Sequence, residues 1–149
     1  MKPLPSFPKE ITYAVFPVAE FWEFLKESDA KYNHFKKLGF SFSCEYSFKG
    51  YSLKPRNVAD RYLPMFKSSH ACKLCGIPIE YVAITRQNGV SRKCNYSVKF
   101  FSYHRGVLVL FNVDHIVPSS KGGLDITENK QTTCRACNAE KADQLFNAS

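Results

Sequence analysis

An aspartate–histidine pair and two asparagines in the C-terminal part of the chain have the residue types that phosphodiester hydrolysis needs. They are Asp114, His115, Asn129 and Asn138. A neutral imidazole near pH 7 can take a proton from water. A carboxylate and an amide oxygen can hold a hard divalent cation, which offsets charge on the phosphate and on the departing oxygen. The sequence therefore predicts a hydrolytic site with one metal ion on Asp114 and Asn138.

Two pairs of cysteines flank this set, Cys72 with Cys75 and Cys134 with Cys137. Two intervening residues let both sulfurs of a pair reach one ion, and two pairs complete the tetrahedral thiolate shell that structural zinc prefers. Four thiolates leave zinc no open position, so the catalytic ion must be a different one, a hard dication held by oxygen ligands. Disulfides or unrelated buried thiols are the alternative interpretation of the same cysteines.

Residues 113–141 resemble the HNH nuclease motif in its zinc-containing form, the ββα-metal fold. The matching residues are Asp114, His115, Ile116, Pro118, Ser120, Gly122, Gly123, Asn129, Cys134, Cys137, Asn138 and Lys141. The spacing of both asparagines from Asp114 also resembles that of the HNH domain in CRISPR effector nucleases. With the first cysteine pair added, the motif organises residues 72–146.

The resemblance implies a role for each residue of the set. Asp114 would bind the catalytic metal, Mg²⁺ or Mn²⁺, and Asn138, in the final helix, would be its second protein ligand. His115 would be the general base that deprotonates the attacking water. Asn129 would brace the loop and help to orient His115. The implied activity is that of an HNH endonuclease or nickase, whose DNA products carry 5′-phosphate and 3′-hydroxyl ends.

The elements predicted around these residues form an α+β fold, in which a ββα-metal module is held together by a zinc site of four cysteines. Residues 107–113 are strand-like, and the stretch after Cys134 has helical propensity. Neighbours on a regular strand point to opposite faces, so Asp114 and His115 can share a site only if the strand ends or distorts there. Pro118 and the glycines that follow it favour an ending.

Two further strands, at residues 81–85 and 98–103, are predicted to add a basic β-hairpin to the module. Asn88–Gly89 is a strong hairpin-turn signal. No acid occurs in residues 81–113, whereas the whole chain carries a net charge of +8 and a pI of about 9.2. Such a surplus favours an anionic partner, here double-stranded DNA, and a solvated basic surface is the alternative. The predicted DNA contacts are Arg86, Arg92, Lys93, Lys99, Arg105 and Lys121.

The chain is predicted to divide into an N-terminal extension, residues 1–66, and a nuclease domain, residues 67–149. Residues 17–38 have the apolar spacing of an amphipathic helix, which ends before Gly39. Residues 1–10 are Pro-rich and predicted to be an extended lead-in. Residues 40–70 are predicted to be loops with short strands, because Gly50, Pro55 and Pro64 interrupt them. This helical extension is a candidate second DNA surface, or a contact for a homodimer or a protein partner.

The N-terminal sequence lacks the continuous apolar segment of a signal peptide. No stretch approaches the roughly 20 apolar residues of a membrane helix. We therefore expect no membrane association and an intracellular, cytoplasmic location, which includes a virus-encoded protein that acts in its host cell. In that compartment the six cysteines are expected to be thiols and metal ligands.

A catalytically inactive zinc module that binds DNA or a host protein is the competing interpretation. Such a module could keep its cysteines and lose its chemistry. The intact set of Asp114, His115, Asn129 and Asn138 argues against it, because a pure scaffold has no need of His115.

Overall fold

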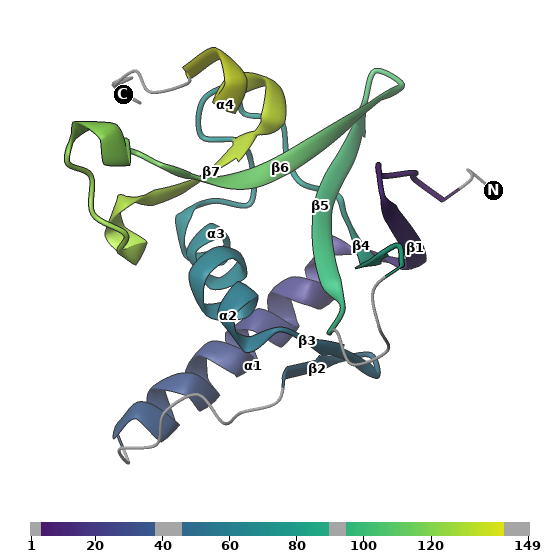
Figure 1. Cartoon of the computed structure of the whole chain (residues 1–149), viewed down its shortest axis with the longest axis horizontal. Helices are drawn as coiled ribbons and strands as arrows, with labels where there is room; N and C mark the ends of the chain where they lie inside the picture. The colour runs from purple at the N-terminus through teal and green to yellow at the C-terminus, as the bar shows by residue number, and fades with distance from the viewer. Residues whose placement is uncertain (1–3, 38–45, 90–94, 142–149) are drawn as a thin grey trace.

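The computed structural model describes residues 4–37, 46–89 and 95–141, which build a mixed α/β fold around an antiparallel sheet (Figure 1). Five strands form this sheet in the order β1-β4-β5-β6-β7, and two short strands pair separately. The large sheet comprises β1 (Glu10–Pro17), β4 (Tyr81–Gln87), β5 (Ser97–His104), β6 (Val107–His115) and β7 (Lys130–Cys134), and the small one β2 (Tyr46–Phe48) and β3 (Tyr51–Leu53). The strands predicted at residues 81–85, 98–103 and 107–113 are confirmed as β4, β5 and β6.

Helices lie on both sides of the β6–β7 pair. Figure 1 shows α1, α2 and α3 together on one side and α4 on the other. The helical elements are α1 (Val18–Lys37), α2 (Pro55–Asn57), the π-helical turn η1 (Val58–Tyr62), α3 (Leu63–Ser68), the 3-10 turns η2 (Ser119–Lys121) and η3 (Thr127–Asn129), and α4 (Arg135–Lys141). The helices predicted at residues 17–38 and after Cys134 are confirmed as α1 and α4. None of the described helices is both long and apolar enough to cross a membrane.

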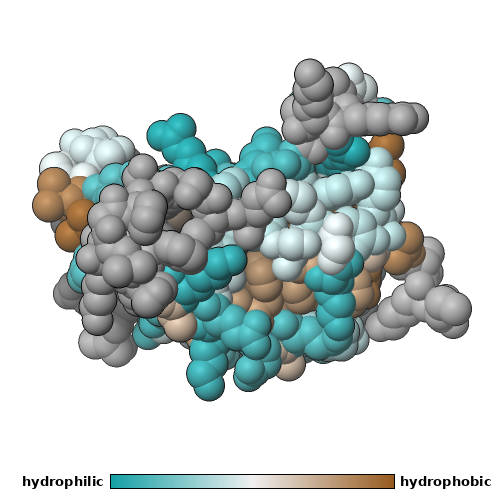
Figure 2. Space-filling view, turned by 90° about the horizontal axis from the view of Figure 1, so that it is seen from below, coloured by the Kyte–Doolittle hydropathy of each residue, from teal (hydrophilic) through white to brown (hydrophobic). Residues whose placement is uncertain are grey.

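The main core lies between α1, α3 and one face of the large sheet. Phe21 and Leu25 of α1 are fully buried there, and the Trp22 ring stacks on that of Phe100 with centroids 5.5 Å apart. A smaller apolar cluster around Phe101 covers the other face of the sheet. The surface seen from below carries mostly hydrophilic side chains, with separate hydrophobic areas between them (Figure 2).

The prediction of loops and short strands for residues 40–70 was wrong over residues 55–68, which are helical. Both prolines that suggested interruptions stand in the first turn of a helical piece, where the missing N–H and the fixed φ of proline are tolerated. Pro64 leaves the carbonyl of Asp60 without its usual donor four residues on. Lys130 Nζ, from β7, donates to that carbonyl at 2.9 Å.

Strand β1 was not predicted, yet it pairs with β4 from Glu10–Gln87 to Pro17–Tyr81. Residues on both sides of the predicted boundary at 66/67 therefore share one sheet. The division into two domains itself stays a prediction.

The large sheet opens between β5 and β6. These strands pair only where Phe100–His104 faces Val107–Phe111, and β6 then pairs with β7 as far as His115. Residues 97–99 and 112–115 consequently diverge. Tyr62 of η1 packs at this opening, and its hydroxyl accepts a hydrogen bond of 2.9 Å from the Val98 N–H. The helical segment 55–68 is thus attached to the sheet at the place where the sheet opens.

Candidate active site and metal centre

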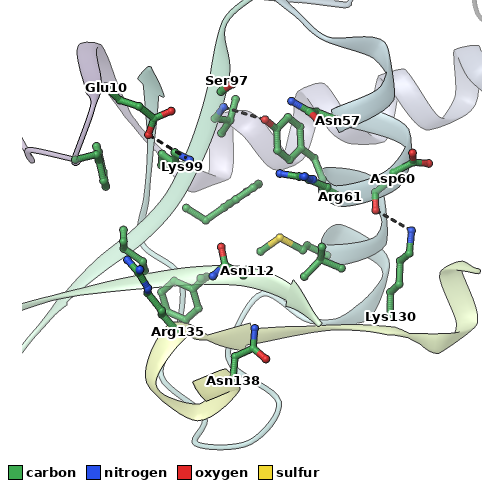
Figure 3. Close-up of a pocket in the computed structure, with 18 of the residues that line it drawn as sticks. Glu10, Asn57, Asp60, Arg61, Ser97, Lys99, Asn112, Lys130, Arg135 and Asn138 are labelled. Carbon is green, nitrogen blue, oxygen red and sulfur yellow. Dashed lines mark hydrogen bonds and ion pairs between the residues drawn. The ribbon is translucent and has the colours of Figure 1, made fainter. Parts of the chain in front are cut away.

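A pocket of about 810 Å³ lies where β5 and β6 diverge, and residues from distant parts of the chain line it (Figure 3). Its polar lining consists of Glu10, Asn57, Asp60, Arg61, Ser97, Lys99, Asn112, His115, Asp125, Lys130, Arg135 and Asn138. The structure thus brings His115 and Asn138 into one pocket, as the predicted site requires. Asp114 and Asn129 do not belong to its lining.

The imidazole of His115 is oriented by Asp125. His115 Nε2 lies 3.0 Å from Asp125 Oδ1, and Lys130 Nζ lies 3.2 Å from the same oxygen. The hydrogen bond from His115 is the main cause that lowers the pKa of Asp125 below its ordinary value of 3.8, followed by the Lys130 ammonium. Asp125 is therefore an acceptor at neutral pH, so Nε2 must carry the hydrogen. In the neutral ring, Nδ1 is then the nitrogen that can accept a proton.

Asn129 ties together the loop that follows His115. Its Oδ1 accepts a hydrogen bond of 2.9 Å from the Val117 N–H, and its Nδ2 donates to the carbonyls of Val117 and Leu124 at 3.1 and 2.8 Å. Within this loop Gly122 has a φ of +84°, and a Cβ on Gly123 would collide with the backbone of Val117. The hydrogen bonds of Asn129 hold the two ends of the loop together.

Asp114 lies behind the pocket, in a buried polar cluster. Its Oδ2 is 3.1 Å from Lys141 Nζ and accepts a hydrogen bond of 3.2 Å from Gln131 Nε2. Lys141 is 1% exposed and also donates to the carbonyl of His115 at 2.9 Å. The register of β6 on β7 runs without a shift to its last pair, His115 with Lys130, so the strand ends directly after His115. The expected ending or distortion at this pair was therefore wrong: the strand runs two residues beyond the predicted 113, and its regular register points Asp114 and His115 to opposite faces of the sheet. α4 is tied to the end of the strand through Lys141.

We predict that Lys141→Met lowers the free energy of unfolding by about 3 kcal/mol or more, because it leaves the buried Asp114 carboxylate without its cation. Chemical denaturation measures this. Lys67→Met is the matched control: its Nζ pairs with Asp29 at 3.1 Å, but its side chain is 47% exposed, and such pairs contribute about 0–1 kcal/mol. Equal losses of unfolding free energy in both variants would show that the buried Asp114–Lys141 pair stabilises the fold no more than an exposed ion pair does.

The four paired cysteines converge on one point. Their sulfurs all lie within 4.8 Å of one another, and Cys75 Sγ is 3.8 Å from Cys134 Sγ. A tetrahedral ion with metal–sulfur bonds of about 2.3 Å needs sulfurs about 3.8 Å apart, so the donor set fits a metal such as zinc. The N–H of Lys73 donates to the carbonyl of Thr132 at 2.9 Å, which holds the first cysteine pair against β7.

The surroundings of the cluster favour a thiolate at Cys72. Burial raises the pKa of this thiol, but backbone N–H groups, those of Cys134 and Cys75 first, outweigh burial and lower it to about 7. The Cys72 thiolate therefore predominates above about pH 7. The pKa values of Cys75 and Cys137 are raised, first by burial, and the neighbouring sulfurs contribute to both. A bound cation would offset the charge of these sulfurs, so metal binding should release protons.

Among the residues predicted to contact DNA, the four that the structure describes are spread over the surface rather than gathered at the pocket. Lys99 lines the pocket but pairs with Glu10 at 3.3 Å, and Arg86 lies over the ring of Tyr96, 5.0 Å from its centroid. Arg105 is in the β5–β6 turn, and Lys121 is exposed in η2. Arg92 and Lys93 lie outside the described residues. Contact of these six residues with DNA remains a prediction.

Several polar residues of the site were not predicted. Asp125 and Lys130 orient His115, Gln131 and Lys141 hold Asp114, and Arg61 enters the pocket from η1. Lys141 is one of the residues that match the HNH motif, but no role was predicted for it. Asp125 could have been proposed from the sequence as a partner of His115, because it is an acid in the short loop between His115 and Asn129.

One comparison with known proteins gives a match. Residues 109–148 match the family model described as HNH endonuclease, and this range contains most of β6 together with β7 and α4. Neither a curated protein nor a solved structure matches the chain significantly. The match contains His115, Asp125 and Asn138, three residues that the structure places at the pocket. Within residues 109–148 the chain is therefore similar to the HNH endonuclease family.

Proposed function

We propose that this chain is a metal-dependent endonuclease or nickase that hydrolyses phosphodiester bonds of DNA. The observation that carries the proposal is the His115–Asp125 pair, which lines the same pocket as Asn138. β6, β7 and α4 would then be the ββα-metal unit, and the four cysteines would be its structural zinc site.

The side chains suggest how the bond is broken. Asp125 accepts the Nε2 hydrogen of His115 and keeps Nδ1 ready to take a proton from water. The water oxygen forms a new bond to phosphorus while the bond from phosphorus to the 3′ oxygen breaks. The water oxygen stays on the 5′-phosphate, and the 3′ oxygen takes a proton from solvent to become a hydroxyl. Asn129 acts indirectly, because it fixes the loop that begins after His115.

The oxygens of Asp114 and Asn138 are the kind of ligand that a hard cation prefers. Within the described ranges, the four cysteines are the only cluster of three or more His, Cys, Asp or Glu side chains that could hold a metal ion. Asp114, through the oxygen that Lys141 and Gln131 do not use, and Asn138 would hold Mg²⁺ or Mn²⁺. When bound, such an ion would offset the charge on the phosphate and on the departing 3′ oxygen. Lys141 would keep the carboxylate of Asp114 in place.

The proposed substrate is double-stranded DNA, which the net charge of +8 favours. The N-terminal region remains a proposed contact for a second copy or a protein partner. An intracellular site of action is part of the same proposal.

Conversion of a supercoiled plasmid tests the function. The purified chain should nick or linearise it with added Mg²⁺ or Mn²⁺ but not without them. The ends should be substrates for ligase, which needs a 5′-phosphate next to a 3′-hydroxyl. An intact plasmid under every metal, combined with retained DNA binding, would instead establish a binding module without catalysis.

Asp125→Asn is predicted to lower the cleavage rate roughly tenfold or more, because an amide no longer selects the His115 tautomer whose Nδ1 accepts protons. A single-turnover assay measures this. The pKa of Asp125 is lowered from its ordinary value of 3.8 in the folded protein. The hydrogen bond between the Asp125 carboxylate and His115 is therefore fully present above pH 3.8, and it is lost only as the pH falls through the lowered pKa. Titration of Asp125 itself should therefore not change the ratio of the two rates from pH 6 to 8. Glu128→Gln, in the same loop, is the control, and an equal effect there would refute the role of Asp125.

A further inference from the structure

The acidic side chains that line the pocket all have cationic partners. Glu10 pairs with Lys99 at 3.3 Å, and Asp60 with Arg56 at 3.7 Å. Asp125 is shared by His115 and Lys130. The two remaining cations of the lining are Arg61 and Arg135. No ion pair involves either of them within the part of the chain that the structure describes, so both guanidinium groups can meet an anion that enters the pocket.

Arg61 is held at the opening of the sheet by its two neighbours. The carbonyl of Asp60 accepts a hydrogen bond of 2.9 Å from Lys130 on β7, and the hydroxyl of Tyr62 accepts one of 2.9 Å from Val98 on β5. The backbone of Arg61 is thereby fixed between β5 and β7. Figure 3 shows its side chain extending from η1 into the pocket, with Arg135 on the opposite wall.

The opening continues past Glu10 and Ser97 along a cationic surface. A second pocket of about 300 Å³ shares Pro8, Glu10 and Ser97 with the first. Its lining includes Lys9, Lys54 and Arg86. A polyanionic strand that leaves the first pocket past Ser97 would therefore meet further positive charge.

We propose that Arg61 binds a backbone phosphate of the DNA strand, next to the phosphate that is cleaved. The inference rests on the proposed nuclease function and adds to it a residue outside the matched range 109–148. A guanidinium presents parallel N–H groups that match two phosphate oxygens, which an ammonium cannot do. The segment 55–68 would then complete the substrate site of the HNH domain, so that Arg61 positions the strand and His115 acts on it.

DNA binding by the full chain tests this role. Fluorescence anisotropy with a short labelled duplex, in buffer without added Mg²⁺ or Mn²⁺, gives Kd without cleavage and without stripping zinc. Arg61→Ala should raise Kd about tenfold and reduce the salt slope of log Kd by about 0.9, the loss of one phosphate contact. Arg61→Lys should restore the salt slope but only part of the affinity. Lys67→Ala is the matched control, because Lys67 lies in the same helical segment, is 47% exposed and pairs with Asp29, and neither residue lines the pocket.

The outcomes separate this role from the nuclease proposal. An unchanged Kd in Arg61→Ala, with a wild type that cleaves plasmid, would overturn the phosphate site alone. Equal losses in Arg61→Ala and Lys67→Ala would also overturn it, since they would show only a general effect of charge. A weakened Kd specific to Arg61, with a wild type that does not cleave, would support the site and overturn the nuclease function. Thermal melting of each variant checks that the exposed substitutions leave the fold intact.

Discussion

Replacing Cys75 by serine is expected to remove the bound metal and to lower the free energy of unfolding by more than about 4 kcal/mol. Cys75 is exposed, so the substitution itself disturbs little packing, unlike a change at the buried Cys72 or Cys134. The loss would come from the metal. Binding to four thiolates contributes on the order of 10 kcal/mol to small zinc domains, comparable with the roughly 5–15 kcal/mol that stabilises a whole protein.

Metal content by mass spectrometry and unfolding in denaturant measure the two parts of this prediction. Cys94→Ser is the control, because its cysteine has no partner at ligand spacing in the sequence. A chelator strong enough to extract zinc should unfold residues 72–146 of the wild type in the same way. A fold that persists unchanged in Cys75→Ser and after chelation would show that the cysteine cluster does not hold the domain together.

The local elements of the nuclease domain could be predicted because their signals are short in range. Alternating apolar residues predicted β4, β5 and β6, and the loss of β-branched residues after Cys134 predicted α4. The cysteine spacing predicted the cluster, since two knuckles can bring four sulfurs together whatever lies between them. Phe100 and Phe101 are buried, so they pack against the two faces of the sheet.

The helical segment 55–68 could not be predicted, because its prolines looked like interruptions. What stabilises it is tertiary: Met65 and Tyr62 are buried, and Lys130 satisfies the carbonyl that Pro64 leaves without a donor. That contact joins residues far apart in the sequence. The same holds for β1, which needs β4 as its partner before it can be a strand.

The ion pairs at the site could not be predicted from the sequence either. Asp114 and Asn138 were predicted from their types, but the Lys141 ammonium that holds Asp114 follows from the packing of α4 on β6. Lys99 was predicted to bind DNA, whereas the structure pairs it with Glu10 on a strand that was not expected. Arg61, with no such partner among the described residues, faces the pocket instead. The charge of a segment thus favours a class of ligand, but it does not predict which cationic side chains form ion pairs within the protein.

Replacing His115 by alanine is expected to slow DNA cleavage by about 10²- to 10⁴-fold, because it removes the general base. The substitution should leave the fold intact. The His115 side chain is 37% exposed, and the backbone carbonyl that Lys141 binds is retained. DNA affinity should change little, since no cationic phosphate contact is removed. His104→Ala is the matched control, an exposed histidine at the end of β5 that does not line the pocket.

The most direct test is therefore the single-turnover cleavage rate of wild type, His115→Ala and His104→Ala with saturating Mg²⁺ or Mn²⁺. We predict cleavage by the wild type and by His104→Ala at similar rates, and at least a hundredfold loss in His115→Ala at unchanged DNA affinity. Cleavage by His115→Ala at the rate of the wild type would contradict the assignment of His115 as the base.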